Sequence, residues 1–89
     1  MTEQNLLIVN EKGLHARASA KFVEVVEAFD ATAEVSLNGV STTGDSIMGL
    51  LMLAASKGTT ITVRTEGAAA AELAKALAEL VANRFGEDY

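Results

Sequence analysis

The chain contains no cysteine, proline or tryptophan, and it has a single histidine. Without cysteine there is no disulfide framework, thiol nucleophile or cysteine-ligated metal centre, and one histidine argues against a structural zinc site. Without proline there is no linker signature and no polyproline segment. We therefore expect one continuous unit that needs neither a metal nor a cofactor.

Positive charge and long apolar runs are also scarce. The 7 Lys and Arg residues are scattered among 12 Asp and Glu residues, for a net charge of -5, whereas nucleic-acid binding favours clustered cations. The longest apolar stretch, Ile47 to Ala55, is too short to cross a bilayer, and no basic-then-apolar segment opens the chain. We expect no nucleic-acid partner, no membrane insertion and a cytoplasmic location.

The length limits what the protein can do alone. A chain of 89 residues is expected to form one small domain over residues 1–89, burying roughly 60–65 per cent of its unfolded surface. That is too little for a nucleotide site together with a protein-substrate site. A partner must therefore supply part of any chemistry.

In the first half of the chain, the spacing of apolar residues changes from that of a strand to that of a helix and back. An apolar run at residues 5–9 predicts a well-buried strand, and helical spacing predicts an amphipathic helix from Ala16 to about Phe29. Alternation then predicts strands at 33–37 and 40–43, joined by Asn38-Gly39, the strongest short signal for a hairpin.

The second half shows one more strand between two helices. Ser46 is a favoured N-cap for a short helix over 47–55, which Lys57-Gly58 is expected to close. Alternation at residues 60–64 predicts a fourth strand. Beyond Gly67, a leucine and valine stripe on strong helix formers predicts a helix that ends near Phe85.

The predicted order is β-α-β-β-α-β-α, an α+β fold. Three helices must cover one face of a four-stranded antiparallel sheet, because only that face can be kept from water. This architecture is an open-faced β-sandwich. Its split βαβ plan allows the strand order 1-4-2-3, although the pattern alone does not fix that order.

The most informative segment runs from Gly13 to Ala20, where the only histidine lies between a strand and a helix. A helix start offers unpaired N–H groups and the positive end of the dipole, which suit a phosphate. His15 is a poor N-cap, and Arg17 in the first turn is unfavourable unless an anion pairs with it. On placement alone, a lone histidine at a loop edge is more often solvated and without a role. The poor N-cap and the unfavourably placed arginine nevertheless both favour a phosphorylatable histidine.

Two blocks of sequence carry a resemblance to a known family. The segment GLHARASAKFV, the segment Gly44 to Leu51, and the strand-then-helix tail from Thr59 resemble the histidine-containing phosphocarrier (HPr) family of the bacterial phosphoenolpyruvate-dependent phosphotransferase system. The resemblance covers nearly the whole chain and implies the strand order 1-4-2-3.

The resemblance also implies a function for the first block. His15 would accept a phosphoryl group on Nδ1 from phospho-Enzyme I and pass it to an Enzyme IIA-type acceptor, as a co-substrate of the relay and not as a stand-alone enzyme. The backbone N–H groups of Ala16 and Arg17, with the Arg17 guanidinium, would hold the phosphate oxygens.

The second block has both structural and functional interpretations. By resemblance, Ile47, Met48 and Leu51 form a partner-docking patch beside His15, at the start of the second helix, although some residues of so apolar a helix must face the core. Ser46 is a natural N-cap, and in relatives with a similar context it is phosphorylated by a dedicated HPr kinase/phosphorylase. The alternative function is a non-catalytic interaction module that binds a regulator through Ile47–Met52 while His15 is passive.

Several positions depart from the usual family pattern. Ala18 stands where a proline is common, and Glu24, Glu27 and Gly49 stand where many relatives are basic or neutral polar. The chemistry at His15 needs none of these positions. They affect the choice of partner, between sugar uptake and the nitrogen-related regulatory branch of the system. We expect a monomer in either branch.

Overall fold

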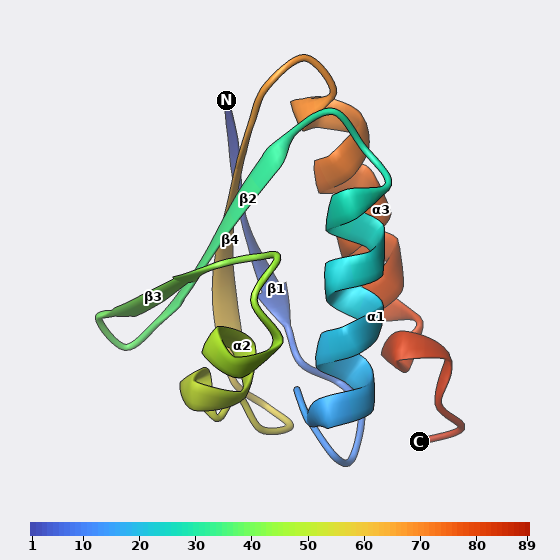
Figure 1. Cartoon of the computed structure of the whole chain (residues 1–89). Helices are drawn as coiled ribbons and strands as arrows, with labels where there is room; N and C mark the ends of the chain where they lie inside the picture. The colour runs from blue at the N-terminus through green and yellow to red at the C-terminus, as the bar shows by residue number, and fades with distance from the viewer.

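The computed structural model describes every residue from 1 to 89, and its elements follow the predicted order, with a short 3-10 turn added at the end (Figure 1). The elements are β1 (Thr2–Leu7), α1 (Ala16–Glu27), β2 (Thr32–Leu37), β3 (Val40–Thr43), α2 (Ile47–Leu53), β4 (Thr60–Glu66), α3 (Ala70–Ala82) and η1 (Arg84–Gly86).

The four strands form one antiparallel sheet in the order β1-β4-β2-β3. Helices α1 and α3 lie side by side along one face, and α2 packs at the β3 end of the sheet (Figure 1). The predicted α+β open-faced sandwich and its strand order are confirmed. None of the helices combines the length and the apolar character needed to cross a membrane.

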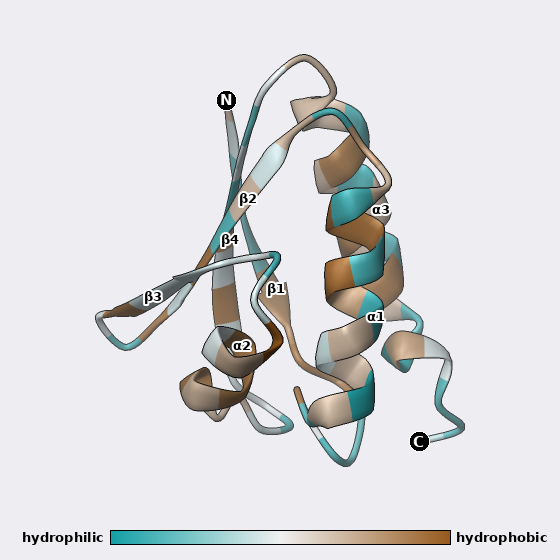
Figure 2. Cartoon of the chain, viewed as in Figure 1, coloured by the Kyte–Doolittle hydropathy of each residue, from teal (hydrophilic) through white to brown (hydrophobic).

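The core lies between the sheet and the helices. Ile61, Val63 and Thr65 alternate inward along β4 and are fully buried, while the residues between them face outward. Phe22 of α1 and Leu77 of α3 are fully buried against this layer. Apolar and polar bands alternate along both helices, which is the pattern of helices with one face on a core (Figure 2).

The predicted hairpin is present with its expected turn. Asn38 and Gly39 both have positive φ, 52° and 83°, as a two-residue type I′ turn requires. The flanking strands pair in the register Leu37↔Val40 and Ser36↔Ser41. The local sequence therefore determines this connection.

The first strand differs from its prediction in extent and in burial. It spans Thr2–Leu7 instead of residues 5–9, because its polar start pairs with β4 in the register Thr2↔Thr65 and Glu3↔Arg64. Glu3 and Arg64 also form an ion pair on the open face. The strand lies at the edge of the sheet with one face exposed, so the prediction of a well-buried strand was wrong.

All three helices end earlier than predicted, and α1 stops at Glu27 instead of near Phe29. Helix α2 stops at Leu53, since Ala54 adopts the left-handed conformation with φ 54° and its N–H bonds to Leu51 O. Gly58 lies in the following turn and not at the helix end. Helix α3 stops at Ala82, after which Arg84 and Phe85 also have positive φ.

This turn after α3 matters for the site. Phe85 is fully buried, and its carbonyl accepts a hydrogen bond of 2.7 Å from the Lys21 ammonium on α1. Burial of a phenylalanine side chain offsets the cost of the unusual backbone. The residues that follow are consequently brought to the start of α1.

Candidate functional site

His15 is the N-cap residue of α1, as predicted. Its backbone is extended (φ -80°, ψ -175°), its carbonyl accepts from Ser19 N at 2.8 Å, and its side chain makes no capping bond. The N–H groups of Ala16, Arg17 and Ala18 donate to no acceptor in the chain. The helix start therefore presents free donors and positive partial charge beside the imidazole.

A tight approach of the backbone holds the loop before His15. Gly13 has φ 64°, and a Cβ on it would lie 2.4 Å from the Ala55 carbonyl oxygen. The next residue, Leu14, is buried and donates its N–H to the same oxygen at 2.8 Å. Only glycine fits at position 13 without a backbone shift.

Helix α2 packs against α1, and the segments on either side of it also contact the α1 region. The His15 loop is joined to the segment after α2, through Ala55. The chain leading into α2 passes Phe22 of α1, where Gly44 packs closely.

The imidazole has one partner inside the protein, and it is Glu87. The ring Nε2 contacts Glu87 Oε2, and the two side chains retain 27% and 15% of their exposure. The other ring nitrogen, Nδ1, has no hydrogen-bond partner in the chain. The ring is thus held at one nitrogen and open at the other.

Asn10 holds the carboxylate from the opposite side. Its fully buried side chain donates from Nδ2 to Glu87 Oε1 at 3.0 Å and to the Gly13 carbonyl at 2.8 Å. The amide oxygen of Asn10 is buried without a partner. A continuous hydrogen-bonded chain therefore runs from Asn10 through Glu87 to His15.

The surroundings of Glu87 change its acidity. Burial raises the pKa of the Glu87 carboxyl, but hydrogen bonds from Asn10 and His15 and the positive charges of His15 and Lys12 outweigh it. The net pKa lies below the ordinary value for glutamate. Glu87 is therefore a carboxylate, and only an acceptor, at neutral pH.

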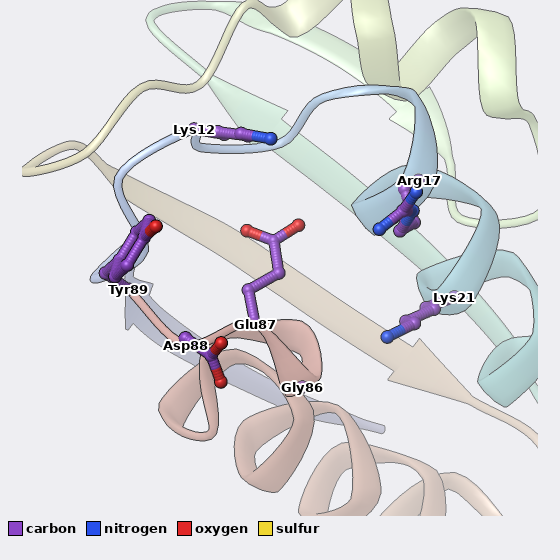
Figure 3. A pocket seen from close by; sticks show the side chains of 7 residues that line it. All are labelled: Lys12, Arg17, Lys21, Gly86, Glu87, Asp88 and Tyr89. Atoms are coloured by element: carbon purple, nitrogen blue, oxygen red, sulfur yellow. The ribbon is translucent and has the colours of Figure 1, made fainter.

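A polar cavity of about 270 Å³ lies beside Glu87. It is lined by Lys12, Arg17, Lys21, Gly86, Glu87, Asp88 and Tyr89. Arg17 and Lys21 extend from α1 toward the space beside the Glu87 carboxylate (Figure 3). Arg17 is exposed and forms no ion pair, so its guanidinium is free to meet an anion.

Ser46 has the predicted capping role. Its backbone is extended, its hydroxyl accepts from Gly49 N at 3.0 Å, and its carbonyl accepts from Leu50 N at 3.0 Å. It therefore satisfies one of the donors that a helix start leaves unpaired.

Helix α2 divides into a buried and an exposed face. Leu50 and Leu53 are buried, whereas Ile47, Met48 and Met52 are exposed by 41%, 69% and 77%. Leu51 is half-buried. Ile47 and Met48 of the expected docking patch thus lie at the surface, and Leu51 lies partly there. The exposed Met48 and Met52 side chains are of a type suited to varied partners.

Gly49 lies at a tight contact between α2 and β3. A Cβ on this glycine would lie 1.8 Å from Thr42 Oγ1. The glycine lets α2 pack directly on β3, so its role is close packing.

Sequence reasoning missed Asn10 and Glu87 as members of the site. Asn10 reads as a strand boundary, and Glu87 lies 72 positions from His15 in an acidic stretch that has no local pattern. The contact between Glu87 and His15 depends on the turn at Arg84 and Phe85. Both residues have positive φ there, which the conformational propensities of arginine and phenylalanine do not predict.

The fold and the site together define the class of small histidine phosphocarriers: an open-faced α+β sandwich with its one histidine at a helix start beside a free arginine. The family model described as "PTS HPr component phosphorylation site" matches residues 2–83. The chain belongs to the HPr family of phosphocarrier proteins of the phosphotransferase system.

Individual relatives agree with this assignment. The chain is 47% identical to the phosphocarrier protein HPr of Neisseria meningitidis serogroup A over 98% of both chains. A crystal structure of HPr from Thermoanaerobacter tengcongensis superposes with a TM-score of 0.95 at 35% identity, covering 100% of both chains. A structure of an HPr dimer from the same organism has a TM-score of 0.77 at 36% identity, over 98% of this chain and 100% of that one.

Proposed function

We propose that His15 carries a phosphoryl group from phospho-Enzyme I to an Enzyme IIA-type acceptor. The Nδ1 lone pair attacks phosphorus, the bond from phosphorus to the donor atom breaks, and its electron pair stays with the donor. The same step, reversed in direction, hands the group to the acceptor. The observation that carries this proposal is an imidazole at a helix start whose Nδ1 has no partner within the protein.

The phosphate oxygens would be held by groups already in place. The free N–H groups of Ala16 and Arg17 supply directed donors, and the unpaired Arg17 guanidinium supplies a full positive charge. The positive end of the α1 dipole adds to this field. These groups stabilise charge on the moving phosphoryl without bonding to phosphorus.

Docking and regulation would use α2. The exposed Ile47 and Met48, with the half-buried Leu51, form an apolar surface for successive partners. Phosphorylation of Ser46 by an HPr kinase/phosphorylase would place about two negative charges next to that surface while remaining favourable at a helix start. The fold would survive and docking would weaken.

The identity of the partners depends on charges elsewhere on α1. Glu24 and Glu27 are exposed and make the second half of that helix negative, which favours acceptors with a basic rim. The relay would serve either sugar uptake or the nitrogen-related regulatory branch. We place the relay in the cytoplasm and expect the carrier to work as a monomer, because Met48 must be accessible to each partner in turn.

The second candidate function is a passive interaction module that binds a regulator through Ile47–Met52. The exposure of Met48 and Met52 favours it equally. It differs from the carrier in one respect, since His15 then accepts no phosphate.

Incubation with Enzyme I and phosphoenolpyruvate separates the two functions. We expect an acid-labile, base-stable phosphate on the parent and none on His15→Ala, which should fold normally because its side chain is partly exposed. A parent that takes no phosphate, or a His15→Ala variant that retains it, would contradict the carrier function.

A further inference from the structure

The chain of side chains from Asn10 through Glu87 to His15 has a defined hydrogen-bond direction. Asn10 Nδ2 lies between two acceptors, the Gly13 carbonyl and Glu87 Oε1, at 2.8 and 3.0 Å. Turning the amide over would place its oxygen against both acceptors, so its orientation is fixed. Glu87 must therefore accept a hydrogen bond from Asn10 at one carboxylate oxygen.

The other carboxylate oxygen determines the state of the imidazole. An ionised carboxylate has no proton to donate, so the contact between Glu87 Oε2 and His15 Nε2 requires the proton on Nε2. In the neutral ring the lone pair then belongs to Nδ1, the nitrogen without a partner. The two side chains are partly buried, which limits competition from water.

We propose that Glu87, itself fixed by Asn10, is a positioning residue that holds His15 in the Nε2-protonated tautomer needed for phosphoryl transfer at Nδ1. This inference rests on the proposed phosphocarrier function. During transfer the Nδ1 lone pair forms the N–P bond while the bond from phosphorus to the donor breaks. The ring keeps its Nε2 proton and becomes an imidazolium, whose charge the Glu87 carboxylate compensates.

The arrangement makes an unusual prediction about the conservative substitution. In Glu87→Gln, the amide oxygen must face the fixed Asn10 donor, so the amide NH₂ faces His15 Nε2. Nε2 then becomes an acceptor, and the proton moves to Nδ1, where it blocks the nucleophile. An asparagine in place of the aspartate of a Ser-His-Asp triad acts through the same reversal of tautomer. Glutamine should therefore be more harmful than alanine, which imposes no tautomer.

Long-range ¹H–¹⁵N NMR spectra of the unphosphorylated protein test the inference directly, because the single histidine gives one unambiguous set of ring signals. At about pH 8.5, where an ordinary imidazole is neutral, we expect the Nε2-H form in the parent, a mixture in Glu87→Ala, and mainly the Nδ1-H form in Glu87→Gln. Glu79→Gln, the same substitution at an exposed position of α3 outside the cavity, is the matched control and should keep the parent tautomer.

The initial rate of phosphorylation by Enzyme I supplies the functional readout. Glu87→Gln should be slower than Glu87→Ala by about fivefold or more, the factor that one hydrogen bond contributes. Thermal unfolding followed by circular dichroism identifies any general loss of structure. A Glu87→Gln protein that keeps the Nε2-H tautomer, or that is phosphorylated as fast as Glu87→Ala, would overturn the inference.

The two hypotheses fail separately. If the parent accepts no phosphate, the proposed function fails, whereas the tautomer comparison needs no phosphoryl donor and still decides the role of Glu87. If the parent is phosphorylated and the tautomers do not change, the carrier function holds and the positioning role is rejected.

Discussion

At the scale of single residues, the reactivity proposed for His15 rests on its neighbours. The ring has Glu87 on Nε2, free backbone donors from Ala16 and Arg17 at the helix start, and no partner on Nδ1. One nitrogen is thus fixed while the other remains available. An ordinary solvated histidine has no such asymmetry, which is why the site supports chemistry better than the lone residue in the sequence did.

Glu87 should also make the stability depend on pH. Because its folded-state pKa is lowered, ionised Glu87 contributes stability above its ordinary pKa of about 4.5, and this contribution is lost as the pH falls through the folded value. His15, Lys12, Arg17 and Lys21 face it from the loop and α1, and Asp88 from its own segment.

We therefore expect the parent to exceed Glu87→Gln in free energy of unfolding at pH values above that range, with the difference shrinking in acid. Denaturant titrations across a pH series measure this difference. Glu79→Gln, an exposed position on α3 that does not line the cavity, is the control. If the difference in free energy of unfolding grows on acidification, the pH dependence assigned to Glu87 has the wrong sign.

At the scale of elements, α2 combines a structural role with the surface proposed for partner docking. Its buried face, through Leu50 and Leu53, and the close contact of Gly49 with Thr42 attach it to the sheet. Its exposed face carries Ile47, Met48 and Met52. Substitutions on the two faces should therefore affect different properties.

Met48→Glu tests the exposed face. It should weaken binding of both Enzyme I and the downstream acceptor by about 1–3 kcal/mol, because a charge replaces an apolar anchor at the interface. Thermal stability should change little, since the Met48 side chain is 69% exposed. Titration calorimetry and melting curves measure the two effects. Unchanged affinity for both partners would remove Met48 from the docking surface.

A pair of substitutions at Ser46 separates capping from recognition. Ser46→Asp keeps an N-cap acceptor for Gly49 N and should preserve stability while slowing phosphorylation of His15 by added charge. Ser46→Ala should cost about 1 kcal/mol of stability yet transfer phosphate like the parent. Denaturation and phosphorylation rates check both. If the two variants transfer equally well, Ser46 is only a cap.

At the scale of the whole molecule, the features predicted from sequence are those with local causes. The spacing of apolar residues predicts the element order. The Asn38-Gly39 turn predicts the hairpin, and the Ser46 cap predicts the start of α2. The limits of β1 depend on pairing with β4, because its polar start has no apolar signal of its own. Local pattern predicts neither the end of α2 at Ala54 nor any other left-handed residue outside glycine and asparagine.

The site was predictable only on its α1 side. His15, Ala16 and Arg17 are adjacent in sequence, so their chemistry is readable from the motif and the helix start. The Glu87 side of the site requires burial of Phe85 and two consecutive positive φ angles, which result from packing against α1. Tertiary contacts therefore complete a site that begins as a sequence motif.

The central claim, that His15 Nδ1 accepts the phosphoryl group, has one direct test. The protein is labelled with ¹⁵N in its only imidazole and phosphorylated by Enzyme I and phosphoenolpyruvate, and the one-bond ³¹P–¹⁵N coupling is measured. We predict a coupling to Nδ1 and a retained proton on Nε2. A coupling to Nε2, or a phosphorylated protein without any ³¹P–¹⁵N coupling, would contradict the account.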